Sequence, residues 1–240
     1  MQSLVSPELR ARVRGAALPI ALAFGRIGLT PNALTVIGFG ISVLAAIAAG
    51  RNAWILAALL VIFGGVFDLF DGALARATNK ASRLGAFLDS VFDRAGEAVV
   101  YLGIVVAAET AGFRAGTYLA AGAMAASFMV SYTRAKSESL GFTPGSGMAN
   151  VGVAPREVRL VIVTIGLLAT GAMGGIVAPI TVYGTVSEWW AGRPALAGSL
   201  GLVVLLATIT TIQRIVHVTR QTPPELSNPS TPDSPGDVHP

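Results

Sequence analysis

The stretch GVFDLFDGALARATNKASRLGAFLDSVFDRAG, residues 65–96, decides how this sequence is interpreted, because it places four aspartates among apolar side chains. They are Asp68, Asp71, Asp89 and Asp93, in a chain of 240 residues of which 53% are hydrophobic and only 12% are charged. Long apolar runs are typical of membrane proteins. Four acids in such surroundings therefore require a specific explanation.

Six mostly apolar runs of membrane-spanning length surround and include this stretch. They cover residues 32–50, 53–76, 83–108, 115–138, 157–179 and 195–217. Runs of about 18 or more apolar residues predict spanning helices, and charges inside them indicate function. We expect an all-α integral membrane protein with six transmembrane helices.

The two ends of the chain differ from these runs. Residues 1–24 carry several arginines and an apolar run of about nine residues, which is too short to cross a bilayer. We expect an N-terminal interfacial amphipathic helix there, with a disordered basic tail as the alternative. Residues 221–240 are rich in Pro and Ser and predict a disordered tail. Residues 25–220 then form the six-helix membrane domain.

The distribution of basic residues predicts the orientation. Of the 17 Lys and Arg residues, only Arg51, Arg114 and Arg193 fall at the helix ends opposite the termini. Cytoplasmic loops carry the excess of Lys and Arg in membrane proteins. We therefore expect a multi-pass protein of the cell membrane with both termini and the acidic end in the cytoplasm.

The spacing of the acids brings them together. Asp68 and Asp71 are three residues apart, and Asp89 and Asp93 are four apart, so each pair shares one helix face. The short link TNKAS makes the two helices antiparallel neighbours. At a rise of 1.5 Å per residue, Asp89 and Asp93 lie about 9 and 15 Å from the cytoplasmic end of their helix. Both acidic faces can converge on one cavity.

A metal site explains this convergence. Facing lipid would cost about 2.5–3.5 kcal/mol for each ionised aspartate, and like charges repel strongly in a low dielectric. Either several acids are protonated or a multivalent cation lies between them. With no Cys and only two His in the sequence, the ligands are hard oxygens, which favour Mg²⁺, Mn²⁺ or Ca²⁺. Four carboxylates can hold two ions about 3.5–4 Å apart, as in phosphoryl displacement.

Small residues and an arginine accompany the acids at fixed intervals. Taken singly, the glycines are explained by helix packing and Arg76 by anchoring at the cytoplasmic surface. Together they form a pattern that resembles the signature of the CDP-alcohol phosphotransferases, and all eight signature positions match. The matching positions are Asp68, Asp71, Gly72, Ala75, Arg76, Gly85, Asp89 and Asp93.

This resemblance implies a homodimeric membrane enzyme that displaces CMP from a CDP-linked donor, CDP-diacylglycerol, with an alcohol acceptor. It implies that the four aspartates hold two Mg²⁺ (or Mn²⁺) ions and that Asp93 is also the general base. The residues that it implies for the CDP-lipid are Pro31, Asn32, Ala33, Leu34, Gly72, Ala75, Arg76, Ser82 and Gly85.

Basic residues that follow the fourth span, lead into the fifth and end the sixth suggest a second anion site. They are Arg134, Lys136, Arg156, Arg159 and Arg214. Anchoring at the cytoplasmic surface is the alternative explanation. As an acceptor-phosphate site they resemble the prokaryotic phosphatidylinositol phosphate synthases, which use inositol 1-phosphate. That group has an Arg-Pro-Glu-Arg run where this chain has Pro-Arg-Glu-Val-Arg, residues 155–159.

Other functions stay open at this point. A phosphorylated sugar or polyol is the expected acceptor, and glycerol 3-phosphate, which would make the chain a phosphatidylglycerophosphate synthase, is the alternative to inositol 1-phosphate. A divalent cation transporter would also explain intramembrane acids. It would not explain the small residues and the arginine at these intervals. The expected partners are membrane lipid and a second copy of the chain, and no nucleic acid.

Overall fold

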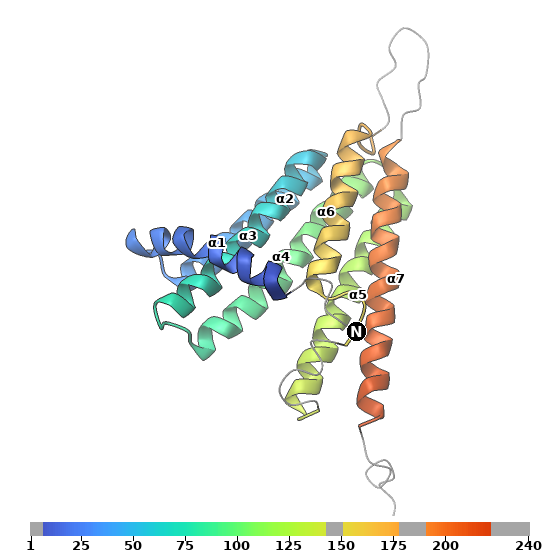
Figure 1. The fold of residues 1–240 in the computed structure, drawn as a ribbon. Coiled ribbons are helices and arrows are strands. Elements are labelled where there is room, and N and C mark those ends of the chain that lie inside the picture. The colour runs from blue at the N-terminus through green and yellow to red at the C-terminus, as the bar shows by residue number, and fades with distance from the viewer. Residues whose placement is uncertain (1–6, 143–150, 178–190, 222–240) are drawn as a thin grey trace, which may run out of the picture.

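The structure is a computed structural model that describes residues 7–142, 151–177 and 191–221, and every regular element in these ranges is an α-helix (Figure 1). The helices are α1 (Pro7–Arg26), α2 (Pro31–Gly50), α3 (Trp54–Ala77), α4 (Arg83–Thr110), α5 (Arg114–Ser139), α6 (Arg156–Ala172) and α7 (Gly192–Thr219). The predicted all-α class is confirmed for these residues.

Local sequence signals start the helices that carry the acids and the helix beside them. The Thr30 hydroxyl caps α2 by accepting a hydrogen bond from the Ala33 amide at 3.2 Å, and Pro31 occupies the first turn, where no amide donor is needed. Ser82 caps α4 in the same way through the Gly85 amide at 3.0 Å. The short connection between α3 and α4 makes them antiparallel neighbours, as predicted.

Small residues pack α2, α3 and α4 together at the end opposite the acids. The buried core there is rich in alanine, including Ala45, Ala49 and Ala57. Helices α2 and α4 approach so closely that a Cβ added to Gly103 would lie 2.2 Å from the carbonyl oxygen of Ala46. Helices in membranes commonly associate through close approach at small residues. Lipid tails are as apolar as the helix surfaces, so the hydrophobic effect does not drive the helices together.

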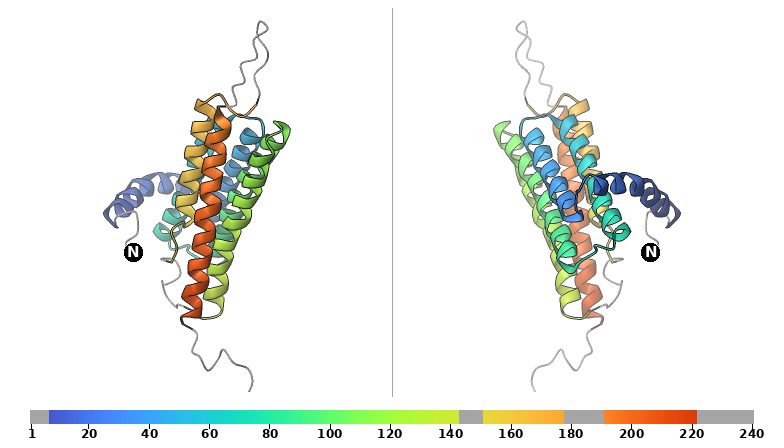
Figure 2. Two further views of the ribbon diagram at one scale, coloured as in Figure 1. Left: turned by 90° about the vertical axis from the view of Figure 1, so that its right-hand side faces the viewer. Right: turned by 90° about the vertical axis from the view of Figure 1, so that its left-hand side faces the viewer.

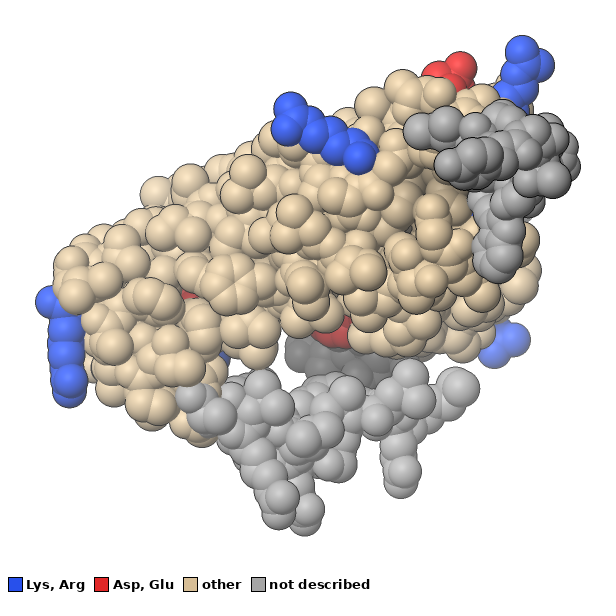
Figure 3. All heavy atoms as spheres, turned by 90° about the horizontal axis from the view of Figure 1, so that it is seen from above, with Lys and Arg blue, Asp and Glu red and all other residues tan. Residues whose placement is uncertain are grey.

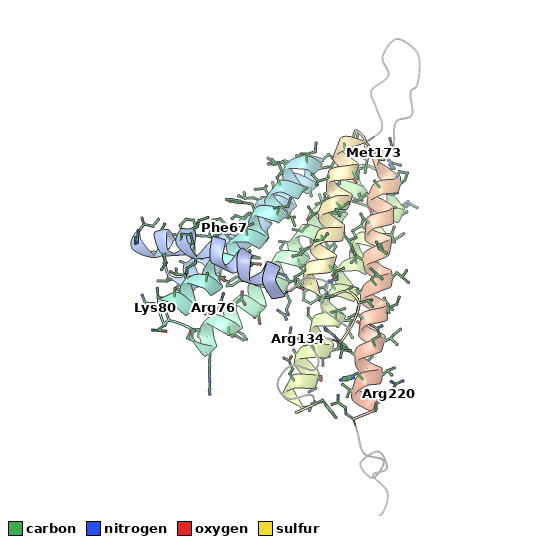
Figure 4. The ribbon with its side chains drawn as sticks, in the orientation of Figure 1. Phe67, Arg76, Lys80, Arg134, Met173 and Arg220 are labelled. Carbon is green, nitrogen blue, oxygen red and sulfur yellow. The ribbon has the colours of Figure 1, made fainter. Side chains whose placement is uncertain are left out.

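Helix α1 lies crosswise to the other helices (Figures 1 and 2). It contacts α3 through Phe24, whose ring centroid lies 5.8 Å from that of Phe67 and 5.7 Å from that of Phe70. Figure 4 labels Phe67 where the two helices cross. Leu34 and Leu74 belong to the same buried cluster, which is separate from the alanine-rich core. The interfacial position of α1 stays a prediction.

Apolar side chains cover much of the outside of the bundle. On α3, Leu59 and Phe63 are 53% and 52% exposed, which a surrounding bilayer explains. By length and composition, α2, α3 and α7 can each cross a membrane. The count of six spans stays a prediction.

Helix α6 ends at Ala172, whereas the prediction extended this span to residue 179. Gly174 and Gly175 have φ values of +89° and +87°, a conformation that glycine adopts readily and that ends a helix. Residues 178 and 179 of the predicted span lie outside the described residues, as do residues 1–6 and nearly all of the predicted C-terminal tail.

The two ends of the bundle differ in charge. Figure 4 shows Arg76, Lys80, Arg134 and Arg220 toward one end and Met173 at the other. Viewed from the Met173 end in Figure 3, the described surface is mostly neither basic nor acidic. The acids and the predicted basic groups therefore belong to the same part of the bundle, while the cytoplasmic location of that end stays a prediction.

Candidate active site

Three helices meet at the acidic residues. Asp68 from α3 and Asp93 from α4 both contact Arg156, the first residue of α6. Arg156 Nη2 lies 2.9 Å from Asp68 Oδ2, and Nη1 lies 2.8 Å from Asp93 Oδ1. Asp89 lies close enough to interact electrostatically with Asp68 and Arg156. The two acidic helix faces meet, as their spacing predicts, and one arginine, which the spacing does not predict, joins them.

Asp71 occupies the most buried position of the four acids. Its side chain is only 5% exposed, and Oδ2 accepts a hydrogen bond from the Thr35 hydroxyl at 2.7 Å. A carboxylate with a fixed donor keeps one orientation, which is how residues behind a metal ligand commonly act. The sequence analysis stopped at Leu34 and missed Thr35, although Thr35 immediately follows the predicted stretch.

The acids suit a hard divalent cation by chemistry. Their donors are carboxylate oxygens without His or Cys, which Mg²⁺ and Mn²⁺ prefer. Asp68 and Asp93 already converge on one cationic group, the Arg156 guanidinium. Within the described residues, however, no three acidic, His or Cys side chains are arranged to hold a metal ion. A metal ion between Asp68 and Asp93 would compete with Arg156 for the same oxygens.

Residues predicted for the CDP-lipid gather beside the acids. A Cβ added to Gly85 would lie 3.2 Å from both Asn32 Oδ1 and Ser82 Oγ, so the starts of α2 and α4 face each other. A Cβ on Gly72 would meet Arg76 Nη1 at 3.2 Å, which places that guanidinium over the glycine. Helix N-termini and an arginine together favour an anionic group such as a diphosphate.

The remaining residues predicted to contact the CDP-lipid differ in how deeply they are buried. Pro31, Ala33 and Ala75 are half-buried near the same end of α2 and α3. Leu34 is fully buried in the cluster beneath α1. A cavity of about 230 Å³ opens between α1, α2 and α3, and Arg26, Pro31 and Lys80 are among its lining residues.

The five basic residues predicted for the acceptor fall into two kinds. Arg134 and Lys136 on α5 are exposed, and Arg134 pairs with Glu138 one turn later at 2.8 Å. Arg156 is half-buried against the acids, and its Nε is buried without a hydrogen-bond partner among the described residues. All three side chains are at least partly exposed, so a ligand could reach them.

Arg159 and Arg214 are instead buried and bonded within the protein. Arg159 is 1% exposed and forms two hydrogen bonds with Glu97, at 2.8 and 2.7 Å. Arg214 is 4% exposed and donates to the carbonyl oxygens of Val130 and Val151. The sequence grouped them with the other basic residues because their partners lie on distant segments, and it missed Glu97 altogether. A glutamate one turn after Asp93 in an apolar helix was the available signal.

The chain is similar to known proteins over most of its length. Residues 28–219 match the family model described as CDP-alcohol phosphatidyltransferase. The chain is similar to the archaetidylinositol phosphate synthase of Pyrococcus horikoshii, with 36% identity over 169 residues, 70% of this chain and 85% of that protein. It is also similar to the phosphatidylinositol phosphate synthase of Cutibacterium acnes, with 32% identity covering 84% of this chain and 91% of that protein.

Solved structures show the same fold. The crystal structure of the Mycobacterium tuberculosis phosphatidylinositol phosphate synthase with CDP-DAG bound matches with a TM-score of 0.71 and 27% identity, over 90% of this chain and 98% of that one. A crystal structure of the same enzyme with manganese and citrate also gives a TM-score of 0.71, over 92% of this chain and 96% of that one.

The chain therefore belongs to the CDP-alcohol phosphatidyltransferase family and is a transferase of phospholipid biosynthesis. The predicted enzyme class is confirmed, and the transporter alternative is set aside. The likeness to the manganese complex supports use of a divalent metal ion.

Proposed function

We propose that this enzyme transfers the lipid phosphate of a CDP-linked diacylglycerol to a hydroxyl group of inositol phosphate and releases CMP. The observation that carries this proposal is the meeting of Asp68, Asp93 and Arg156 from three helices. That meeting places a candidate base and a candidate phosphate-binding cation side by side. The named relatives, which are archaetidylinositol and phosphatidylinositol phosphate synthases, support inositol phosphate over glycerol 3-phosphate.

The reaction assigns separate tasks to the two sides of the site. The acceptor hydroxyl oxygen attacks the phosphorus that carries the lipid, and its proton passes to the Asp93 carboxylate. The new oxygen–phosphorus bond forms as the bond from that phosphorus to the bridging oxygen breaks, and CMP leaves with the bridging oxygen. General base catalysis of this kind contributes about 10²–10⁴-fold to the rate.

The donor would lie along the starts of α2 and α4 and the end of α3. Asn32, Ser82 and Gly85 come together there, and Arg76 lies over Gly72. In this proposal the four aspartates hold two Mg²⁺ or Mn²⁺ ions, which when bound supply Lewis-acid stabilisation of the diphosphate and the departing CMP. Acyl chains would extend into the leaflet along the apolar outer faces of the helices.

The acceptor phosphate would bind at Arg156, with Arg134 and Lys136 contributing from α5. A buried donor without a partner is costly, and Arg156 Nε is such a donor among the described residues. The Arg156 side chain is 29% exposed as a whole, so an anionic ligand could contact the outer part of the guanidinium, although Nε itself is buried. Arg159 and Arg214 are buried and bonded inside the protein, so we propose for them a role in shaping this site rather than in direct contact.

The proposal includes the membrane arrangement predicted from the sequence. Helices α2 to α7 would each cross the bilayer, with the aspartates in its cytoplasmic half and the protein a homodimer. Helix α6 has 17 residues, which is at the lower limit of length for a spanning helix. The charges on α4 are compatible with a span whose polar residues face the site rather than lipid.

A panel of acceptors tests the proposal. Purified protein in lipid vesicles receives one CDP-diacylglycerol donor with inositol 1-phosphate, glycerol 3-phosphate, inositol or serine, and CMP release is measured with and without Mg²⁺. We expect Mg²⁺-dependent release that is fastest with inositol 1-phosphate. Faster release with glycerol 3-phosphate would make the chain a phosphatidylglycerophosphate synthase, and equal rates with inositol would remove the phosphate pocket. Repeating the assay with an ether-linked donor separates phosphatidyl from archaetidyl transfer.

A further inference from the structure

The pair formed by Glu97 and Arg159 connects two helices that have little close backbone packing with each other. Helix α6 packs mainly against α7 and α3, whereas Glu97 lies on α4. The guanidinium and the carboxylate make a two-bond contact at 2.8 and 2.7 Å, and the two residues are only 1% and 5% exposed. Two parallel hydrogen bonds between an arginine and a carboxylate fix the relative orientation of the two side chains as well as the distance between them.

Arg159 also holds the backbone that leads into α6. Its Nη1 donates to the carbonyl oxygen of Ala154 at 3.0 Å, and the Ala154 amide in turn donates to the Thr210 hydroxyl of α7 at 2.9 Å. Ala154 is fully buried. Each nitrogen of the Arg159 guanidinium therefore has a partner, and the start of α6 is fixed to both α4 and α7.

A second contact between an arginine of α6 and an acid of α4 lies one helical turn away, at the site. Asp93 lies four residues before Glu97 on α4, and Arg156 lies three residues before Arg159 on α6, so each pair occupies one face of its helix. Arg156 bridges Asp68 and Asp93. A shift or rotation of α6 relative to α4 would move both arginines together. The buried pair is therefore placed where it could determine the position of the Arg156 guanidinium.

We infer that Glu97 and Arg159 are positioning residues that hold Arg156 at the acceptor side of the acidic cluster and thereby set the affinity for the acceptor phosphate. This inference rests on the proposed function of Arg156. It assigns no direct contact with substrate to either residue. Disturbing the pair should raise the acceptor KM and leave the donor KM nearly unchanged, because the donor residues lie on α2, α3 and the start of α4.

Two variants of the pair test this inference. Arg159→Lys keeps the charge but loses the planar two-bond contact, and we expect the acceptor KM to rise about tenfold, as is typical when a supporting residue is changed. The double variant Glu97→Leu with Arg159→Met replaces the buried ion pair by apolar side chains, which folded proteins commonly tolerate. We expect its melting temperature to stay near that of the natural protein while its acceptor KM stays raised.

Arg193→Lys is the matched control. Arg193 also bonds the protein interior, donating to the carbonyl oxygens of Ile176 and Ala111 at 2.9 and 2.7 Å, but at the opposite end of the bundle. Its replacement should change stability without changing either KM. If the double variant folds and has the natural acceptor KM, the buried pair is only structural and the inference fails.

Adding Arg156→Ala separates this inference from the proposed function. If the pair acts through Arg156, changing Arg159 in the Arg156→Ala background should raise the acceptor KM no further. A further rise of the same size would overturn the inference while leaving the acceptor pocket intact. If Arg156→Ala alone left the acceptor KM unchanged, the acceptor assignment of the proposed function would fail, and the positioning role would fail with it.

Discussion

The same three helices, α2, α3 and α4, form a closely packed apolar contact at one end of the bundle and a cluster of polar side chains at the other. At one end, alanines and glycines bring the backbones together, so closely that Gly103 has no room for a side chain against Ala46. At the other end, the same helices present Thr35, Asp68, Asp71 and Asp93 to one another and to α6. Close packing of small apolar residues provides stability at the alanine end, and the buried and half-buried polar groups provide chemistry at the acidic end.

This division explains why the acids can be kept in a membrane protein at all. Closely packed alanine surfaces hold the helices in one arrangement, and polar groups can then be buried where each has a partner. Changes at the acidic end should therefore act mainly on turnover, and changes at the alanine end mainly on stability. Three substitutions test this contrast, in order of decreasing effect on the reaction.

Asp93→Asn should have the largest effect. The amide cannot accept the acceptor's proton, so we expect kcat to fall about 10²–10⁴-fold. Binding of the CDP-lipid, measured directly with labelled donor, should stay within a few-fold of the natural value, because the asparagine keeps a side-chain oxygen that a metal ion can use and the other donor residues are unchanged. Glu109→Gln, on the same helix at the opposite end, is the control and should leave turnover unchanged. Loss of donor binding in Asp93→Asn would leave Asp93 with a mainly structural or metal-holding role and remove its assignment as the base.

Thr35→Val should have an intermediate effect. It removes the hydroxyl that donates to Asp71 at 2.7 Å while keeping the shape of the side chain. If Asp71 holds a metal ion, the Mg²⁺ concentration for half-maximal CMP release should rise about tenfold, with a smaller change in donor KM. Thr35→Ser, which restores the hydroxyl, should recover most of the loss. An unchanged Mg²⁺ dependence in Thr35→Val would separate Asp71 from metal binding.

Gly103→Ala should have the smallest effect on the reaction and a clear effect on stability. The added methyl group would lie 2.2 Å from the Ala46 carbonyl oxygen, so α2 and α4 must move apart. Overpacking of this kind costs about 1–3 kcal/mol, which thermal unfolding in detergent can measure. Gly40→Ala on α2, where nothing lies within 4 Å of the new methyl group, should unfold no earlier than the natural protein. A changed acceptor KM in Gly103→Ala would break the division between the two ends.

Much of the fold was predictable from local pattern. The predicted spans 32–50, 53–76 and 115–138 differ by at most one residue at either end from α2, α3 and α5. The error at α6 has a local cause, because the apolar run continues through Gly174 and Gly175, whose backbone conformation ends the helix. Hydropathy alone does not distinguish an apolar turn from an apolar helix.

The site was predictable in its acids and not in its arginines. The cost of placing ionised aspartates in lipid, together with their spacing, was enough to gather them at one site. The sequence did not indicate which of the five basic residues face the acids and which are buried within the protein. Arg156 and Arg159 differ by three positions, yet one faces the acids and the other is buried against Glu97.

The sequence by itself determined the helices, the acidic faces and the family, because periodicity, spacing and desolvation act over a few residues. Only the tertiary structure decided which arginine can meet a ligand and which one holds the helices in place. The reason is that the partners lie far apart in the chain, 88 residues for Arg156 and Asp68 and 62 for Arg159 and Glu97. Packing of separate helices, which no local pattern encodes, brings them within hydrogen-bond distance.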